Sequence, residues 1–278
     1  MDLEGQTAII TGSTRGIGKE IALALAEQGV NITVTGKTDE PKEDMEGTIY
    51  QTAEEVEELG AEALPIKLDV RFEEEAKNVV DETIDKWGRI DILINNAGAI
   101  QLTPVHDTPP TRFHLLMPVN ARGSYVMSYY ALPHMIEQDY GHILMASPPN
   151  EAQSTPGKTA YGLSKYGMTF IAKSLAGEVY DHNIGVNAFW PVTAIDTRAT
   201  RYFGLGSEEM WRTPEILCDT VLEIVQKEPG DFSGNAVLDE PFLEEHGVED
   251  FSKYNVVEGT NPPPLSATMF GVDYEREE

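Results

Sequence analysis

The sequence predicts an α/β fold in which a seven-stranded parallel sheet is doubly wound, with helices on both of its faces. Short apolar runs alternate with segments of helical periodicity along most of the 278 residues. Strands are expected near residues 7–11, 31–36, 62–69, 90–95, 141–146, 184–190 and 234–239, with helices between them. Such alternation is typical of a parallel sheet, whose ligands bind at the carboxyl ends of the strands.

The first predicted strand leads into a glycine-rich turn. The turn consists of Thr11, Gly12, Ser13, Thr14, Arg15, Gly16, Ile17 and Gly18, and a helical pattern follows from Lys19 to Gly29. Glycines let the backbone approach a pyrophosphate, and a helix start provides free N–H groups and a positive dipole end. The alternative is an ordinary turn with packing glycines. Glycines spaced four and two residues apart, between a strand and a helix, favour a dinucleotide site of the Rossmann type.

The second predicted strand bears on the choice of cofactor. It ends at Thr35-Gly36-Lys37 and so offers no acidic side chain to a ribose 2′-hydroxyl. Lys37 and Arg15 are instead two cations that can hold a 2′-phosphate, which favours NADP(H). In the competing interpretation both cations are surface charges, Asp39 or Glu40 reaches the ribose, and the cofactor is NAD.

A tyrosine and a lysine, Tyr161 and Lys165, lie four residues apart in a predicted helix. At this spacing the two side chains share one face, so a phenol and an ammonium can point into the same cleft. A neighbouring cation favours the phenolate, and lowering a phenol pKa from about 10 to about 7 requires roughly 4 kcal/mol. Taken alone, so short a pattern favours an ordinary amphipathic helix with a solvated lysine. The glycine-rich turn shifts the balance toward acid/base chemistry.

Length and composition indicate one domain. We expect residues 1–256 to form it, because no linker-like stretch interrupts the first 250 residues, and residues 257–278 to form an acidic C-terminal tail. Cys218 is the single cysteine, which excludes an intramolecular disulfide and fits a reducing compartment. No apolar stretch is long enough to span a membrane, and the N-terminus lacks a signal-peptide pattern. The expected location is the cytoplasm.

The net charge is −27, from 47 acidic and 20 basic side chains. This charge argues against nucleic acids and anionic membranes as partners, because their phosphates would repel the protein. The acidic residues are spread over predicted helices, as in Glu54-Glu55 and Glu57-Glu58. Such spacing predicts a halophilic protein with an acidic surface suited to high salt. The alternative is an acidic protein without this adaptation.

Other features are less specific. The six histidines, at positions 106, 114, 134, 142, 182 and 246, show no metal-ligand spacing, so no metal site is predicted.

Thr213 and Pro214 predict the N-cap and first turn of a helix that runs to Gln226. Aromatic residues surround a predicted substrate lid over residues 194–213 and favour an apolar substrate, unless they pack in the core; they are Phe189, Trp190, Tyr202, Phe203 and Trp211.

Together these motifs resemble the short-chain dehydrogenase/reductase family in its shorter, single-domain class. The resemblance covers roughly residues 3–256 and rests on the glycine-rich turn, Asn95-Asn96-Ala97-Gly98, Asn120, Ser147 and Tyr161-x-x-x-Lys165. Within the family the chain is similar to the subgroup of hydroxysteroid dehydrogenase-like protein 2. That similarity rests on Gly36-Lys37-Thr38, Ser147-Pro148-Pro149, the segment from Val186 to Pro191 and the closing Leu238-Asp239-Glu240.

The resemblance implies a catalytic set of Tyr161, Lys165, Ser147 and Asn120. Tyr161 would donate or accept the proton, and Lys165 would lower its pKa and bind the nicotinamide ribose. Ser147 would bind the substrate oxygen, and Asn120 would hold a water, unless it only bonds backbone groups. Ser147 stands fourteen residues before Tyr161, where the family usually has thirteen, so Ser154 is a second candidate.

The resemblance also implies a set of cofactor-binding residues. They are Gly12, Ser13, Thr14, Arg15, Gly16, Ile17, Gly18, Lys37, Asp69, Val70, Asn96, Ala97, Gly98, Tyr161, Lys165, Pro191, Ile195 and Thr197. Asp69 matches an acid that contacts the adenine, although by position alone it is equally a turn residue. The usual Pro-Gly turn after the sixth strand is Pro191-Val192 here, and the segment to Thr197 is one residue longer. The resemblance therefore specifies the residues that would contact the nicotinamide carboxamide less closely than the other cofactor-binding residues.

The implied activity is that of an NADP(H)-dependent oxidoreductase that interconverts an alcohol and a carbonyl on an apolar small molecule. A catalytically silent nucleotide-binding sensor or scaffold is the alternative, motivated by Ser147-Pro148-Pro149 and the missing Pro-Gly turn. A sugar-nucleotide epimerase or dehydratase shares Tyr-x-x-x-Lys but normally has a larger C-terminal substrate domain. A homodimer or homotetramer is implied through two apolar stretches near 112–135 and 159–179, which carry Leu115, Leu116, Tyr125, Met168, Phe170 and Ile171.

Overall fold

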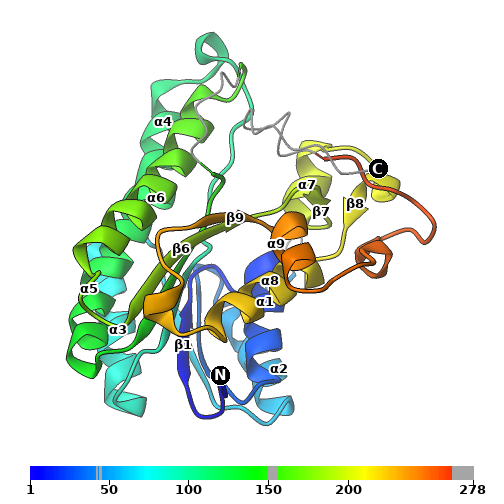
Figure 1. Cartoon of the computed structure of the whole chain (residues 1–278). Coiled ribbons are helices and arrows are strands. Elements are labelled where there is room, and N and C mark those ends of the chain that lie inside the picture. Colours follow the sequence, from blue (N-terminus) through cyan, green and yellow to red (C-terminus); the bar gives the residue numbers. More distant parts are fainter. Residues whose placement is uncertain (42, 44–45, 150–155, 265–278) are drawn as a thin grey trace.

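A seven-stranded parallel sheet organises the chain, as the sequence predicts (Figure 1). The computed structural model describes residues 1–41, 43, 46–149 and 156–264. The strand order is β3-β2-β1-β4-β5-β6-β9, so the chain reverses its direction of growth between β1 and β4. The strands are β1 (Thr7–Ile10), β2 (Asn31–Gly36), β3 (Ala63–Lys67), β4 (Ile92–Asn95), β5 (Gly141–Ala146), β6 (Ile184–Trp190) and β9 (Ala236–Leu238). Ligands bind at such a reversal, beyond the carboxyl ends of the strands.

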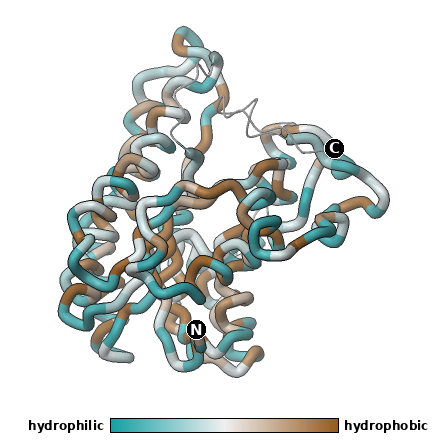
Figure 2. Tube along the Cα trace, in the orientation of Figure 1, coloured by the Kyte–Doolittle hydropathy of each residue, from teal (hydrophilic) through white to brown (hydrophobic). Residues whose placement is uncertain are grey.

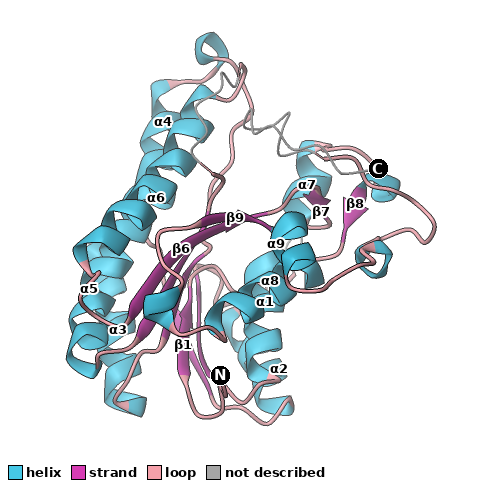
Figure 3. Cartoon of the chain, viewed as in Figure 1, coloured by secondary structure: helices cyan, strands magenta, loops and turns pink. Residues whose placement is uncertain are grey.

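Helices cover both faces of the sheet (Figures 1 and 3). One face carries α1 (Gly16–Ala26), α2 (Ile49–Glu58), α8 (Glu215–Val225) and α9 (Asp239–Glu245), and the other carries α3 (Glu73–Trp87), α5 (Gly123–Gln138) and α6 (Thr159–Glu178). The strands are largely apolar, and most of their residues are buried, because both of their faces are covered. In β5, Leu144 and Ala146 pack toward the first layer and Ile143 and Met145 toward the second.

Hydrophobic and hydrophilic residues are mixed along the helices, as Figure 2 shows. In α3 the buried residues Ala76, Val79, Val80 and Thr83 recur at helical spacing. Three glutamates in its first turn and a lysine in its last turn match the helix dipole, and Gly88 ends the helix in the left-handed region at φ 73°. These local signals explain why a strongly charged segment still folds as a helix.

The helix predicted from Thr213 begins slightly later than expected. It is α8, which starts at Glu215, and Pro214 rather than Thr213 occupies the N-cap position. The backbone N–H of Thr213 donates instead to the carbonyl oxygen of Tyr254, at 2.7 Å. This long-range bond holds Thr213 in the connection that precedes the helix. The predicted N-cap, Thr213, is therefore wrong by one residue.

A small second sheet was not predicted. It consists of β7 (Ala194–Ile195) and β8 (Trp211–Arg212), which pair in parallel, with α7 (Arg198–Phe203) between them. Two-residue strands are too short to show an alternating pattern, so sequence periodicity cannot reveal them. These elements make up the segment predicted as a lid, hereafter the lid segment (residues 194–213), and they project beyond the carboxyl ends of the main strands (Figure 1).

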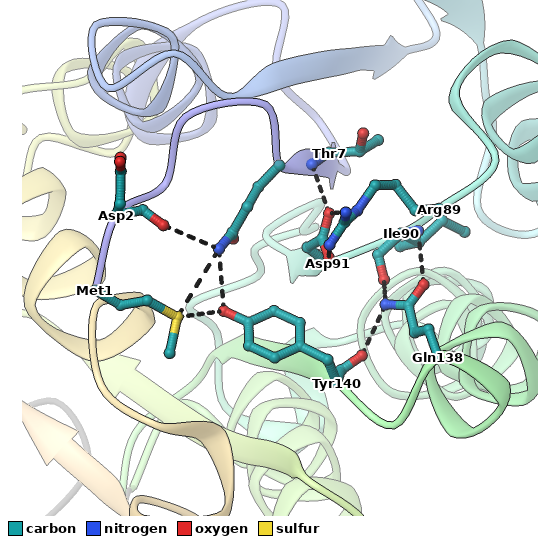
Figure 4. A network of polar contacts seen from close by, with 9 residues as sticks. Met1, Asp2, Thr7, Arg89, Ile90, Asp91, Gln138 and Tyr140 are labelled. Carbon is teal, nitrogen blue, oxygen red and sulfur yellow. Dashed lines mark hydrogen bonds and ion pairs between the residues drawn. The ribbon is translucent and has the colours of Figure 1, made fainter.

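Polar side chains form a network at the opposite end of the sheet, around the amino ends of β1, β4 and β5 (Figure 4). The buried Asp91 carboxylate accepts hydrogen bonds from the backbone N–H of Thr7, at 2.8 Å, and from the Arg89 guanidinium, at 2.7 and 2.6 Å. Gln138 donates to the carbonyl oxygens of Ile90 and Tyr140. At this end of the sheet the polar groups bond one another within the chain. A ligand site is therefore expected at the other end, where the carboxyl ends of the strands lie.

Among the residues that the structure describes, no helix combines the length and the hydropathy needed to cross a membrane. Within the same residues, no group of three or more histidine, cysteine or acidic side chains could hold a metal ion.

Candidate active site

A cavity of about 730 Å³ lies at the carboxyl ends of the strands, between the glycine-rich turn and the lid segment. Most residues predicted to bind a cofactor line it: Gly12, Thr14, Arg15, Gly16, Ile17, Gly18, Lys37, Asp69, Val70, Asn96, Ala97, Gly98, Tyr161, Lys165, Pro191, Ile195 and Thr197. Among the residues that the structure describes, Ser13, Asn120 and Ser147 are the predicted site residues that do not line it. Ser154 lies outside the described residues.

The glycine-rich turn is a close-packed cradle. Gly12 has φ 69°, in the left-handed region that favours glycine. A Cβ on Gly18 would overlap Asn96 and lie 2.5 Å from the Gly12 carbonyl oxygen, so this position accepts no side chain without rearrangement. Asn96 fastens the cradle to β4, because its amide donates to the carbonyl oxygens of Thr11 and Gly12, at 3.0 and 3.1 Å. This geometry leaves the backbone open to a phosphate at the start of α1.

Ser13 supports the turn from within. Its hydroxyl donates to the Ile10 carbonyl oxygen and accepts from the Thr35 N–H, each at 2.9 Å. The side chain is fully buried. It therefore ties β1 to β2 and does not face the cavity.

The two cations predicted to hold a 2′-phosphate both lie at the cavity, in different environments. Arg15 donates to the carbonyl oxygens of Glu46 and Gly47, at 2.8 and 2.9 Å, and to the Thr38 hydroxyl, at 3.0 Å. It thus fastens the end of the β2–α2 connection over the glycine-rich turn. The Lys37 side chain is 63% exposed, and its ammonium is 4.0 Å from the Asp69 carboxylate.

Acidic groups near this end of the cavity are already paired. Arg71 hydrogen-bonds Asp69, at 2.6 Å, and so holds the pKa of that carboxyl below its usual range. Asp39, the alternative ribose acceptor, pairs with Lys67 at 2.8 Å. Asp39 does not line the cavity formed by the described residues, whereas Lys37, Thr38 and Asp69 do.

Tyr161 and Lys165 share one face of α6 and both line the cavity, as their spacing predicts. They are 3% and 4% exposed. Burial raises the pKa of Tyr161 above its ordinary value and lowers the pKa of Lys165 to about 7. Desolvation therefore dominates the pKa shifts of both groups. Lys165 alone does not produce the low phenol pKa expected from the sequence.

Lys165 is held in place by two contacts at the base of the cavity. Its ammonium donates to the Ala146 carbonyl oxygen, at 2.6 Å, and lies 5.2 Å from the centre of the Trp190 ring. Ala146 ends β5 and Trp190 ends β6, so two adjacent strands present the acceptor and the ring. Such a contact between a cation and an aromatic face favours the charged lysine.

Asn120 stands behind the cavity wall in a π-helical turn, Pro118–Arg122, between α4 (Pro110–Met117) and α5. Its amide oxygen accepts from the Ala99 N–H, at 2.7 Å, and its amide nitrogen donates to the Ala99 carbonyl and the Ser164 hydroxyl, at 3.0 and 2.8 Å. A Cβ on Gly98 would lie 3.7 Å from both the Asn120 amide oxygen and the Lys165 ammonium. Asn120 thus bonds both the Ala99 backbone and the Ser164 side chain, while lying close to the lysine.

Ser147 is fully buried at the end of β5. Its hydroxyl accepts from Thr169 of α6, at 2.8 Å, and its backbone N–H donates to the Phe189 carbonyl oxygen, at 3.1 Å. These bonds turn Ser147 toward the core beneath α6. The structure therefore does not bring Ser147 to the cavity with Tyr161 and Lys165.

The cavity continues into an apolar end beside the lid segment. Its walls include Ile100, Leu115, Val119, Trp190, Tyr202, Phe203 and Leu205. Phe189 is instead buried in the core, and Trp211 is 5% exposed and donates to the Leu205 carbonyl oxygen. Three of the five aromatic residues singled out in the sequence thus face the cavity. Ile100 and Val119 carry no sequence signal, because only the loop after β4 and the π-helical turn bring them here.

The cavity residues fit a nicotinamide dinucleotide. A glycine cradle at a helix N-terminus suits a pyrophosphate, Lys37 and Thr38 lie where the second strand ends, and Tyr161 and Lys165 lie near the apolar end. A parallel sheet whose order reverses beside such a cradle, with a tyrosine–lysine pair in the same cavity, defines a Rossmann-type fold and is typical of an oxidoreductase.

The profile of the short chain dehydrogenase family matches residues 6–205. The chain therefore belongs to the short-chain dehydrogenase/reductase family. This family membership, together with the dehydrogenases among the similar solved structures, supports an oxidoreductase activity. It is 43% identical over 275 residues to human hydroxysteroid dehydrogenase-like protein 2, covering 98% of this chain and 65% of the human protein. The chain thus spans slightly less than two thirds of that relative's length.

Solved structures agree with this family. A short chain dehydrogenase from Mycobacterium thermoresistibile is 38% identical, with a TM-score of 0.88 and coverage of 94% of each chain. A metagenomic short-chain oxidoreductase solved in complex with NADP is 25% identical, with a TM-score of 0.72, and the match covers 86% of this chain and 98% of that one. These neighbours support a nicotinamide cofactor for this fold.

Proposed function

We propose that the protein is an NADP(H)-dependent oxidoreductase that interconverts an alcohol and a carbonyl on an apolar small molecule. The observation that carries this proposal is the single cavity that joins the glycine cradle, the Tyr161–Lys165 pair and an apolar end. A bound nicotinamide would supply the hydride chemistry. The test is a fluorescence titration with NADPH and NADH, followed by turnover assays on a panel of aliphatic, aromatic and polycyclic carbonyls and alcohols.

We propose that Tyr161 donates the proton to the substrate oxygen or accepts it, because its side chain lines the cavity beside Lys165. Lys165 would bind ribose hydroxyls and stabilise the phenolate when a second positive charge is present. Asn120 would hydrogen-bond both the loop residue Ala99 and the α6 residue Ser164. It would thereby fix the position of the face of α6 that carries Lys165. For Ser147 we propose a supporting role, because it follows Ala146, the acceptor of Lys165, and points into the core.

A sensor or scaffold without turnover remains the second candidate, since Ser147 is absent from the cavity walls of the described chain. Tight NADPH binding without turnover on any compound of the panel would favour it. Turnover of one carbonyl that Tyr161→Phe abolishes would exclude it. The buried pair of Tyr161 and Lys165 argues for the enzyme, because burying two titratable groups is costly unless they act together.

The choice of NADP over NAD gives a charge-reversal prediction. Lys37→Asp removes an exposed cation at the cavity and adds an anion there. The ratio of the NADP to NAD dissociation constants should shift toward NAD by about 1.5–3 kcal/mol, or roughly 10- to 150-fold. Lys77→Asp makes the same charge change on α3, outside the cavity walls, and should leave the ratio unaltered. An unchanged ratio in Lys37→Asp would refute the 2′-phosphate contact.

The oligomeric state is a further expectation. Outward-facing residues of α5 and α6 expose large apolar surface: Tyr125 is 57% exposed, Tyr129 60%, Leu163 51% and Phe170 67%. Leu116 and Met168, also named from the sequence, are buried in the protomer and cannot contribute. We expect a homodimer or homotetramer through these helices. Light scattering that finds a single 30.7 kDa chain at molar salt would contradict this expectation.

Salt dependence tests the halophilic proposal. A net charge of −27 raises self-repulsion in the folded state most strongly at low ionic strength. The Debye length is about 30 Å at 0.01 M and about 3 Å at 1 M salt, so the melting temperature should rise steeply in the first additions of chloride and then level off. Only a shallow, continuing rise is expected from generic salt effects on apolar burial. A flat profile would indicate an acidic surface without halophilic adaptation.

The cytoplasmic location is also proposed. Cys218, the single cysteine, is buried and cannot form an intramolecular disulfide, which fits a reducing compartment.

A further inference from the structure

Two consecutive acidic residues, Asp239 and Glu240, are fully buried where β9 ends and α9 begins. They are the last part of the motif Leu238-Asp239-Glu240, to which the proposed chemistry assigns no role. Buried carboxylates are costly unless they are paired or hydrogen-bonded, so their partners indicate what they are for. Those partners lie at the two ends of the lid segment.

Asp239 holds the chain just before the lid segment. Strand pairing places Leu238 opposite Trp190, so the next residue lies beside the turn that follows β6. One carboxylate oxygen of Asp239 accepts from the backbone N–H of Val192, at 2.8 Å, and from its neighbour's N–H, at 2.7 Å. The turn of Pro191 and Val192, which lacks the usual glycine, is thereby fixed by a side chain from the first residue of α9.

Glu240 holds the far end of the lid segment. Its carboxylate pairs with the Arg212 guanidinium at 2.9 Å, with side chains 3% and 4% exposed. Arg212 belongs to β8, where it lies opposite Ile195 of β7, and its carbonyl oxygen accepts from the Asp196 N–H at 2.8 Å. Arg212 also donates to the Phe251 carbonyl oxygen, at 2.7 Å. The strand that closes the lid segment is thus anchored to the start of α9.

Between these two anchors the chain forms one wall of the cavity. Ile195, Thr197, Arg198, Phe203 and Leu205 all line it. A Cβ on Gly16 would lie 3.6 Å from the Thr197 methyl group, so this wall also approaches the glycine-rich turn. Small displacements at Val192 or Arg212 would therefore move the wall relative to the cradle.

We propose that Asp239 and Glu240 are positioning residues that fix both ends of the lid segment and so set the wall that receives the nicotinamide half of the cofactor. The inference rests on the nicotinamide-binding function proposed above. Stability alone does not account for the Arg212–Glu240 pair, because replacing a buried ion pair with apolar side chains of similar size is often neutral. What an apolar pair cannot supply is the directional bond that fixes β8.

The test compares two ligands that differ only beyond the adenosine end. In the proposed binding mode NADPH would reach the lid wall, and adenosine 2′,5′-bisphosphate would not. Asp239→Leu removes the acceptor of the Val192 N–H, and the double variant Arg212→Met/Glu240→Leu replaces the ion pair. Each should weaken NADPH binding by about tenfold, the loss expected for one charge-assisted hydrogen bond, and leave bisphosphate binding within about twofold of the wild type. Asp239→Asn keeps an acceptor oxygen and should bind both ligands within about twofold of the wild type.

Amide hydrogen exchange on the ligand-free proteins supplies a second readout. Residues 192–212 should exchange at least about tenfold faster in Asp239→Leu and in the double variant, while β1 and β4 keep their protection. If Asp239→Leu fails to fold, the double variant decides. Equal losses for both ligands, or wild-type affinities together with wild-type exchange, would overturn the inference. If the wild type binds neither NADPH nor NADH, the proposed function fails, and the exchange rates still decide whether Asp239 and Glu240 hold the lid segment.

Discussion

Replacing Tyr161 with phenylalanine should abolish turnover while leaving cofactor binding intact. The substitution removes one hydroxyl from a buried, cavity-lining side chain and keeps the ring that packs with Leu116 and Val192. General acid or base catalysis contributes roughly 10²- to 10⁴-fold to a rate, so we expect a loss of that size in kcat. The measurement is turnover on the best compound of the carbonyl and alcohol panel, with NADPH affinity measured by titration in parallel.

Tyr166→Phe is the matched control for this experiment. Tyr166 lies on the same helix and packs against the same apolar cluster, but it does not line the cavity of the described chain. The control should keep kcat within about twofold, because removing a hydroxyl remote from the reacting atoms does not change transition-state stabilisation. A Tyr161→Phe variant that retains more than about a tenth of wild-type kcat would show that another group transfers the proton.

Acid should destabilise the protein through His142, a fully buried residue in the middle of the sheet. Burial lowers the pKa of His142 to about 4, from 6.5. The unfolded chain therefore binds a proton that the folded state resists, and the free energy of unfolding falls as the pH drops from 6.5 toward 4. The loss from this residue is about 3 kcal/mol, is absent above pH 6.5 and is complete below about pH 4.

The measurement is urea unfolding of the wild type and of His142→Leu between pH 4 and 7.5. Leucine has a similar size and lies on the same sheet face as Leu144, so the variant should fold and lack this pH dependence. Burial raises the pKa of Asp239 to about 7, which favours the folded state as the pH falls and so opposes His142 in the same range. The difference between the two proteins removes that shared contribution. Parallel pH profiles would show that His142 is not the titrating group.

The strand pattern of the main sheet and the glycine-rich turn were readable from the sequence, because both depend on local rules. Strands covered on both faces are rich in apolar residues, and a turn packed as tightly as the one between Gly12 and Gly18 accepts no side chain at Gly18 without rearrangement. Likewise, four-residue spacing on a helix is sufficient to place Tyr161 and Lys165 on one face. From the sequence alone, these features predict the fold, the family and the end of the sheet at which the cavity lies.

Tertiary structure decided what depends on where separate elements meet. Ser147 faces Thr169 instead of the cavity because α6 packs over the end of β5, and no spacing rule contains that contact. The environment of Lys165 is likewise set by burial between β5, β6 and α6, which is why desolvation and not a simple charge pair governs its pKa. The partners of Asp239 and Glu240 lie 47 and 28 positions away in the chain, at Val192 and Arg212. Sequence patterns describe neighbours along the chain, whereas bonds of this kind exist only once the sheet has aligned its strands.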